Sequence, residues 1–248
     1  MEPDSDLVGT PTPIREFQTT IWSEVFRAGK GDDTRAQQAL SRLCQAYWYP
    51  IYSYVRRRGH QLHEAQDLTQ GFFSNLLEKK HLESVDSAKG RFRSFLITAL
   101  KWYLANEWDR AKAEKRGGKA ITFSMDEEVA EARFQAEAVG TVSPEYAYDR
   151  QFARAILERV MSALEAECDE ESQGRFEGLS KHVFGKSGVG TYAETAAALG
   201  LSEGGVKSAV RRMRLRCGEL FRAEISETVA VVDEIDDEIR YLLSLLGD

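Results

Sequence analysis

Apolar residues recur every three or four positions along most of the chain, and this spacing limits the fold more than any other feature. One segment shows the pattern clearly, with apolar side chains at Phe152, Ile156, Val160 and Leu164. Residues spaced in this way share one face of an α-helix, where they can pack against a core. The alternation typical of a strand is weak everywhere, and Ala120–Ser124 is its best example. The sequence therefore predicts an all-α fold.

Helix breakers and caps divide this pattern into segments. Pro50 is expected to break or kink the first long helix, and Gly59 to end the segment that follows it. Ser143 and Pro144 form a good helix start, because serine caps a helix and proline fits its first turn. The expected helices cover about 20–27, 34–49, 51–58, 63–79, 91–115, 144–164 and 175–184, and a further pair follows residue 190.

Two small helical domains joined by a linker account for these segments. The chain of 248 residues is long enough for two such domains, each with its own core. Gly117 and Gly118 are followed by an acidic, alanine-rich stretch, which is typical of a linker. The predicted boundaries are an N-terminal extension at 1–32, a first domain at 33–116, a linker at 117–142, a second domain at 143–224 and an acidic tail at 225–248.

Charge is distributed unevenly along the chain, whose formal net charge is −7. Between Val206 and Gly218 there are five cations and no acid, and between Lys89 and Lys119 there are nine cations and three acids. Residues 219–248 instead carry nine acids and two arginines. Basic islands in an acidic chain indicate places where a polyanion is held, although solvated helix faces would give the same pattern.

The 206–218 island belongs to a predicted helix-turn-helix. Thr191 and Glu194 form a capping box, Gly200 ends the first helix, and Ser202 caps the second. The apolar arc of the second helix contains Val206, Ala209, Val210, Met213, Cys217, Leu220 and Phe221. In this motif the second helix enters the DNA major groove, where cations contact phosphates and arginine reads guanine. The predicted DNA-binding residues are Lys207, Ser208, Arg211, Arg212, Arg214 and Arg216. A structural hairpin with a solvated basic face is the alternative.

The helix expected at 91–115 places cations beside aromatic and amide groups on its exposed side. Aromatic rings stack on unpaired bases while lysine and arginine hold the backbone, so this face suits single-stranded nucleic acid. Its residues are Lys101, Trp102, Asn106, Arg110 and Lys112. A tryptophan in a helix–helix contact is the alternative interpretation.

The helix expected at 63–79 exposes a polar, slightly acidic face that contains a leucine. Such a face suits a protein partner, although an ordinary solvated surface would look the same. The residues on it are Asp67, Gln70, Ser74, Leu77 and Glu78.

Together these segments resemble the sigma-70 family of bacterial RNA polymerase factors. EAQDLTQGFF (Glu64–Phe73) resembles the helix that binds core polymerase. GRFRSFLITALKWYLANEWDRAKAEKR (90–116) resembles the helix that recognises and opens the −10 promoter element. TYAETAAALGLSEGGVKSAVRRMRLR (191–216) resembles region four, whose helix-turn-helix reads the −35 element. Two helical domains joined by one short linker are similar to the extracytoplasmic-function (ECF) class.

The resemblance implies a non-catalytic, cytoplasmic protein that binds core RNA polymerase and directs transcription to chosen promoters. It implies a polymerase contact that includes Asp67, Gln70, Ser74 and Leu77, with Lys101, Trp102, Asn106, Arg110 and Lys112 at the −10 strand and the helix-turn-helix on −35 DNA. An anti-sigma factor or another regulator is a further candidate partner. The chain departs from the family at Gly71, where an acid usually stands. A glycine inside a helix costs about 1 kcal/mol relative to alanine.

Two other functions fit parts of this sequence. A stand-alone helix-turn-helix regulator would bind duplex DNA without polymerase, and a helical interaction scaffold would bind no DNA at all. No cofactor, metal or enzymatic activity is expected, because His60 and His63 lack further ligands at suitable spacing and no nucleophile–base pattern is present. No apolar run is long enough to span a membrane.

The tail has two possible roles. Its acidic stretch precedes an apolar cluster of Ile239, Leu242, Leu243 and Leu246. It either extends the second domain as a helix or folds back and competes with DNA for a basic face.

Overall fold

The structure is a computed structural model that describes residues 34–77, 90–113, 127–137, 142–168, 170–184 and 190–247. In these ranges the regular elements are helices, and one isolated antiparallel bridge joins Arg91 to Val229. The all-α prediction is confirmed for this part of the chain. The elements are α2 (Thr34–Arg57), α3 (Leu62–Leu77), α4 (Phe92–Ala113), α5 (Glu127–Ala136), α6 (Pro144–Ala166), α7 (Glu170–Ser180), α8 (Tyr192–Leu199), α9 (Glu203–Ser226), the 3₁₀ helix η2 (Val232–Glu234) and α10 (Ile235–Ser244).

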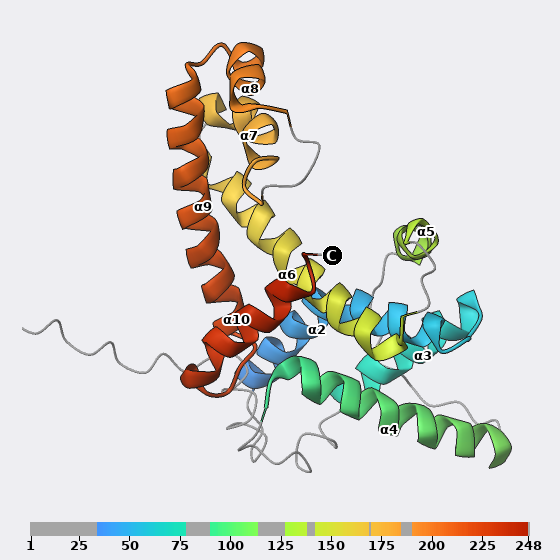
Figure 1. Cartoon of the computed structure of the whole chain (residues 1–248). Coiled ribbons are helices and arrows are strands. Elements are labelled where there is room, and N and C mark those ends of the chain that lie inside the picture. The colour runs from blue at the N-terminus through green and yellow to red at the C-terminus, as the bar shows by residue number, and fades with distance from the viewer. Residues whose placement is uncertain are drawn as a thin grey trace, which may run out of the picture.

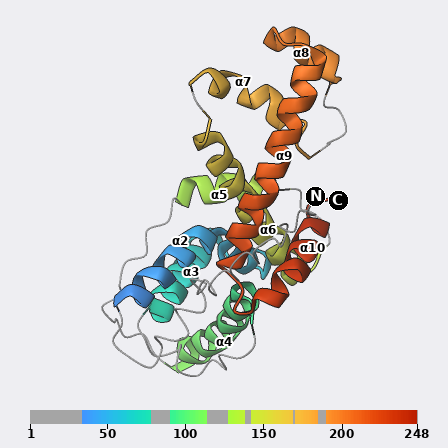
Figure 2. The same ribbon diagram turned by 90° about the vertical axis from the view of Figure 1, so that its left-hand side faces the viewer.

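The helices form a broad body with a smaller lobe standing above it. Figure 1 shows α2, α3, α4 and α10 in the body, while α7 and α8 lie in the upper lobe. The two long helices α6 and α9 connect the two parts, and Figure 2 shows the same arrangement from the side. Because α6 packs against both α2 and α9, it joins the base of the molecule to the lobe.

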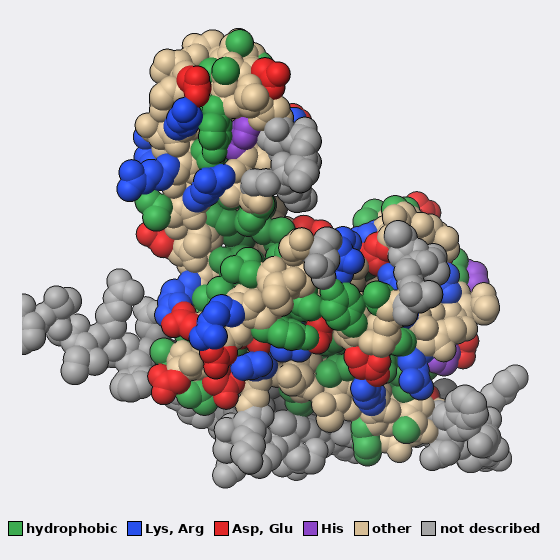
Figure 3. Space-filling view, in the orientation of Figure 1, with side chains coloured by type: hydrophobic (Ala, Val, Ile, Leu, Met, Phe, Trp, Pro, Cys, Tyr) green, Lys and Arg blue, Asp and Glu red, His purple; other side chains and the backbone are tan. Residues whose placement is uncertain are grey.

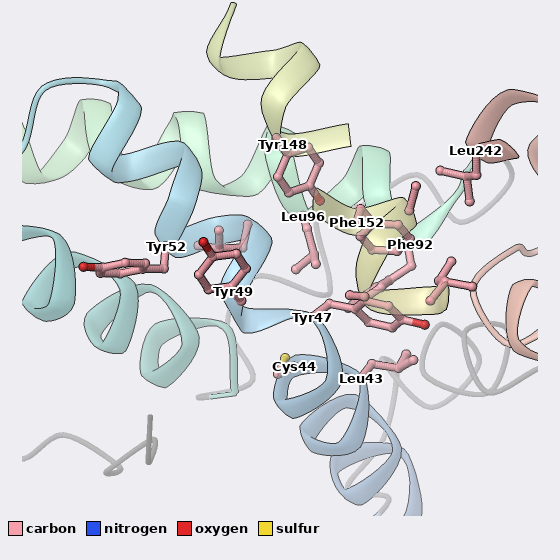
Figure 4. Packing of buried hydrophobic residues seen from close by; sticks show 14 of the residues in the cluster. Leu43, Cys44, Tyr47, Tyr49, Tyr52, Phe92, Leu96, Tyr148, Phe152 and Leu242 are labelled. Atoms are coloured by element: carbon pink, nitrogen blue, oxygen red, sulfur yellow. The ribbon is translucent and has the colours of Figure 1, made fainter. Parts of the chain in front are cut away.

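The kink predicted in the first long helix is present. Tyr47 has a non-helical backbone (φ −124°, ψ 22°), three residues before Pro50. A proline inside a helix removes one hydrogen bond and crowds the carbonyl of the preceding turn, which accounts for the bend. The ring of Tyr47 stacks on Phe152 of α6, with ring centroids 4.4 Å apart, and its other neighbour is Phe92 of α4 (Figure 4). The kink therefore lies where three helices meet.

The predicted helix stripes form the core. Every residue of the stripe on α6 is buried, from Phe152 to Leu164. One continuous apolar cluster extends from Leu40 in α2 to Leu245 after α10, and it includes buried residues of α3, α4, α6 and α9. The core thus continues across residue 143, where the sequence places the start of a second domain. The predicted domain boundaries remain predictions.

The predicted linker contains a helix that the sequence interpretation did not include. In α5, Glu131 binds Arg56 of α2 through both carboxylate oxygens, at 2.9 and 3.1 Å, and accepts a hydrogen bond from Tyr52. Partial burial acts to raise the pKa of Glu131, but these hydrogen bonds outweigh it and lower the pKa to about 2. The strand candidate at Ala120–Ser124 and the expected helix at 20–27 lie outside the described residues.

Gly71 has a structural role in the packing of α3 against α4. A Cβ atom added at Gly71 would overlap the hydroxyl of Tyr103 on α4. The Tyr103 ring also packs edge-on against Phe72, with ring centroids 5.8 Å apart. The glycine therefore lets a tyrosine cross closely over α3, which gives a physical reason for its presence within a helix.

The change in the free energy of unfolding caused by Gly71→Ala should be less favourable in the native protein than in a Tyr103→Phe background. Without the hydroxyl the overlap disappears, and alanine should then stabilise the fold by about 1 kcal/mol through its higher helix propensity. A double-mutant cycle measured by urea unfolding gives the coupling between the two positions. An equal effect of alanine in both backgrounds would contradict this account of Gly71.

Candidate nucleic-acid interface

The helix-turn-helix has the caps that its sequence predicts. The Thr191 hydroxyl accepts a hydrogen bond from the Glu194 amide (3.2 Å), and the Glu194 carboxylate accepts one from the Thr191 amide (2.6 Å). Gly200 ends α8 in the left-handed conformation (φ 65°), which glycine adopts without strain. The Ser202 hydroxyl caps α9 by accepting from the Gly205 amide at 3.0 Å. These contacts define a tight turn between α8 and α9.

A small core holds α9 against α7 and α8. Val206 and Val210 of α9 are buried with Ala196 of α8 and Leu179 of α7. Further along α9, the arc predicted as apolar is buried at Cys217 and Phe221 and partly buried at Met213 and Leu220. Since one side of α9 is used in this way, the opposite side of its first half faces solvent.

The exposed side of α9 presents cations to solvent. Lys207, Ser208, Arg211 and Arg212 are all exposed. Lys207 forms an ion pair with Glu203 one turn earlier (2.7 Å), which raises the pKa of the lysine. Arg211 and Arg212 have no hydrogen bond or ion pair to any residue that the structure describes. Their guanidinium groups can therefore bind phosphate or guanine without first leaving an internal partner.

The space-filling view shows how these side chains are placed. In Figure 3, Lys and Arg side chains gather on the side of the upper lobe where α9 runs. Arg211 and Arg212 of α9 are exposed, and Leu215 lies one turn beyond Arg211 with 64% of its surface accessible. We call the four residues Lys207, Ser208, Arg211 and Arg212 the α9 face.

Arg214 and Arg216, which were also predicted to bind DNA, have partners elsewhere in the protein. The Arg214 guanidinium donates to the carbonyl oxygens of His182 (2.7 Å) and Val183 (3.0 Å) in the turn after α7. Arg216 binds both carboxylate oxygens of Glu167, at 2.6 and 2.7 Å, and also Glu219. A DNA contact by either arginine would compete with these bonds. The sequence could not show the bonds to His182 and Glu167, because 32 and 49 residues separate these partners from the arginines.

His182 is a second residue of this lobe that sequence reasoning missed. It is buried, with its Nε2 2.7 Å from the Thr195 hydroxyl and its ring 4.8 Å from that of Tyr192. Together with Arg214, it connects the turn after α7 to both helices of the helix-turn-helix. The lone histidine is thus part of the packing that orients α9.

Arg214→Ala should destabilise the protein, while Arg211→Ala should leave its stability unchanged. Losing Arg214 leaves the two carbonyl groups after α7 without their donor, at a cost of about 1–3 kcal/mol. Arg211 has no described partner to lose, and the two residues carry the same side chain on the same helix. Urea unfolding of the two variants measures the difference. Equal stability of both would show that the Arg214 contacts contribute little.

The predicted −10 face lies on α4, at the base of the molecule (Figure 1). Trp102 is 56% exposed, so its ring presents a wide surface to solvent. Lys101 forms an ion pair with Glu145 at the start of α6 (2.9 Å), and the lysine hydrogen bond lowers the pKa of that carboxyl. Asn106 is partly buried. Arg110 and Lys112 lie in the last turns of α4, and their side chains are outside the described part of the structure.

The predicted polymerase face of α3 is smaller than expected. Asp67 is exposed and Gln70 is partly buried, but Ser74 and Leu77 are only 6% and 8% exposed. The prediction that Ser74 and Leu77 face solvent was therefore wrong. Phe73 and Leu77 are one turn apart and both buried, so the buried side of α3 is wide enough to include Leu77. The exposed residues gather in the first half of the helix, at His63, Glu64 and Asp67. Glu78 lies outside the described residues.

The three predicted faces do not converge on one cleft. The α9 face belongs to the upper lobe, whereas α4 and α3 belong to the body (Figures 1 and 2). Each face could therefore contact a separate stretch of a long partner. A single small-molecule site formed by all three is excluded by this arrangement.

A hollow of about 430 Å³ lies between α2, α5, α6 and α9. Trp48 and several alanines line it, together with Arg133 and Arg159. Both arginines are already paired, Arg133 with Glu158 at 3.0 Å and Arg159 with Glu224 at 2.9 Å. The hollow thus presents paired charges to any ligand.

Within the described ranges, no group of three or more His, Cys, Asp or Glu side chains is placed to hold a metal ion. His60 instead lies 2.9 Å from Glu64, and His63 is 3.3 Å from Gln66. Cys44, Cys168 and Cys217 are free thiols. No helix in this part of the chain is both long and apolar enough to cross a bilayer.

No protein-family model, curated protein or solved structure matches this chain. Its function must therefore be argued from its own residues.

Proposed function

We propose that the protein is a sigma factor of the ECF type, which binds core RNA polymerase and directs transcription initiation at chosen promoters. The observation that carries the proposal is the helix-turn-helix of α8 and α9. Its caps are complete, and its second helix exposes Arg211 and Arg212 with no partner among the described residues. The order of the sequence segments that resemble sigma regions two and four supports it further.

In the proposed complex the α9 face enters the major groove of the −35 element. Arg211 and Arg212 supply donors for phosphate or guanine, and Lys207 exchanges Glu203 for a phosphate. Such an exchange costs little, because the side chains of Lys207 and Glu203 are 56% and 50% exposed, and ion pairs at the surface are weak. Arg214 and Arg216 have a different role in this scheme, since their internal bonds help to orient the helix.

The α4 helix takes the unpaired strand of the −10 element in the proposal. Its exposed Trp102 offers a stacking surface for a base, and Lys101 lies one residue away to hold the backbone. Lys101 is paired with Glu145, but both side chains are nearly half exposed, so a strand phosphate can replace the carboxylate. Arg110 and Lys112 would extend the same contact along the helix.

Core polymerase binds the first half of α3 in the proposal. Asp67 is exposed there and Gln70 is partly accessible, which leaves these two as the proposed contact residues. Ser74 and Leu77 are buried and would support the helix from within. Such a partner places the protein in the cytoplasm, beside promoter DNA, where an anti-sigma factor could also bind it.

A stand-alone helix-turn-helix regulator is the second candidate, since the α9 face alone would suffice for it. The charge of the chain argues for a polymerase subunit instead. With a net charge of −7 and nine acids among residues 219–248, the free protein repels DNA. Binding to polymerase would supply the additional contacts that DNA recognition needs.

Gel filtration with bacterial core RNA polymerase tests the proposal. The native protein should co-elute with polymerase at micromolar concentration, and Asp67→Arg combined with Gln70→Ala should abolish co-elution. Glu165→Arg is the matched control, because it makes the same charge change at an exposed residue near the end of α6. If the native protein does not co-elute, the stand-alone regulator becomes the better interpretation.

DNA binding by the polymerase complex should depend steeply on salt, and part of that dependence should come from the α9 face. Replacing Arg211 and Arg212 by alanine removes up to two phosphate contacts, so the slope of log K against log salt should fall by about 1–2. Arg240→Ala, on the exposed side of α10, is the control and should leave the slope unchanged. A slope unaffected by the double variant would remove the α9 face from the DNA contact.

A further inference from the structure

The C-terminal segment 227–247 folds back onto the beginning of α4. Glu238 of α10 is 1% exposed, and both of its carboxylate oxygens bind Arg93 of α4, at 2.9 and 3.2 Å. The same carboxylate lies 3.0 Å from the Nε of Arg91. A buried carboxylate held by two arginines, of which Arg93 is 145 residues earlier in the chain, is a built contact between distant segments.

Arg93 connects α10 to α6 as well as to α4. Its Nη1 donates to Asp149 of α6 (2.7 Å), and the hydroxyl of Tyr241 donates to the other oxygen of Asp149 (2.6 Å). The Arg93 guanidinium also lies 4.6 Å from the centre of the Tyr241 ring. The pKa of Arg93 is raised, because its two carboxylate partners outweigh its burial. One guanidinium thus joins three helices.

Backbone and apolar contacts reinforce this junction. The amide of Phe92, in the first turn of α4, donates to the carbonyl of Thr228 (2.7 Å), so the tail satisfies a group that a helix start leaves unpaired. Arg91 and Val229 form the antiparallel bridge. Leu242 of α10 is fully buried in the cluster that also contains Phe92 (Figure 4). The end of α9 is thereby held beside the start of α4.

This junction limits the distance between the two proposed DNA-binding faces. Arg211 lies 15 residues before the end of α9, and Trp102 lies 10 residues after the start of α4. At 1.5 Å per helical residue, with a few extended residues at the junction, the two residues are no more than about 50 Å apart even on a straight path. Figure 1 shows α4 turning away from the line of α9, which shortens the separation further.

The two promoter elements are farther apart than this. By their names, the −35 and −10 elements are centred about 25 base pairs apart, which is about 85 Å along B-form DNA at 3.4 Å per base pair. Bending so short a duplex until the two elements lie within about 50 Å of each other is costly, because DNA is stiff on this length scale. The arrangement in the structure therefore cannot place α9 and α4 on both elements of a promoter at once.

We propose that segment 227–247 is an intramolecular latch that holds α4 beside the end of α9 and must release α4 before both promoter elements are bound. The proposal rests on the sigma-factor function. It assigns the latch to the bridge between Arg91 and Val229 and to the buried carboxylate of Glu238. Because α6 also packs against α2, opening must break that contact as well, and in the proposal binding to polymerase supplies the free energy for it.

A reversible covalent lock tests the latch. Directly opposed residues of an antiparallel bridge have Cα atoms about 4.5–5.5 Å apart, which suits a disulfide. Arg91→Cys with Val229→Cys, in a Cys168→Ser background, should therefore crosslink on oxidation. The oxidised protein should still co-elute with core polymerase but lose promoter-specific transcription by about tenfold or more, since a closed state forms no productive complex. Reduction should restore transcription.

Controls separate the lock from the substitutions that make it. Val229→Cys alone in the same background cannot form the crosslink and should transcribe equally with and without oxidant. Glu238→Gln removes the buried charge and therefore weakens the latch. At a limiting concentration of the protein, this variant should give at least about threefold more transcription than the native chain. Asp237→Asn, one residue away and exposed, should not change transcription. Circular dichroism checks that each variant keeps its helices.

The outcomes distinguish the latch from the function on which it rests. Transcription by the oxidised lock at the level of its reduced form would overturn the latch while leaving the sigma-factor function standing. Failure of the native and reduced proteins to co-elute with polymerase would overturn the proposed function, and the latch with it. If Glu238→Gln loses its helix content, the lock alone decides the question.

Discussion

The buried guanidinium of Arg93 is the contact on which the arrangement of the body depends. It binds Glu238 and Asp149, and its own carbonyl accepts a hydrogen bond from Tyr148 (2.9 Å). Burying charges is costly, so such a cluster is stable only when every group is paired. Removing one partner of a buried pair costs about 3–5 kcal/mol, because the other charge is left without compensation. α4, α6 and α10 therefore keep one another in place.

The arginines of α9 differ in whether they have partners within the described part of the protein. Arg214 and Arg216 bind carbonyl and carboxylate groups of the same chain, and these bonds fix how α9 sits on α7 and α6. Arg211 and Arg212 are left to solvent on the other side of the helix. In the proposed function α9 needs both kinds of residue, since a contact to DNA is specific only when the helix that carries it is rigidly placed.

Predictions from the sequence were confirmed for local features that depend on contacts between residues close together in the chain. The caps at Thr191 and Ser202, the kink before Pro50 and the stripe on α6 depend on neighbours within one or two turns. The interpretation failed where distant segments meet. Leu77 was placed on the surface, and the helix α5 within the predicted linker was missed, because the residues that bury or bind these segments lie elsewhere in the chain.

The sequence by itself determined that the described chain is helical, where several helices begin and bend, and that α9 has one apolar and one basic side. Those properties follow from periodicity, caps and charge along a single helix. Tertiary structure alone decided which arginines on α9 have internal partners, why Gly71 must be small, and that the acidic tail returns to Arg93. These features depend on groups that are far apart in the chain and meet only when the helices pack.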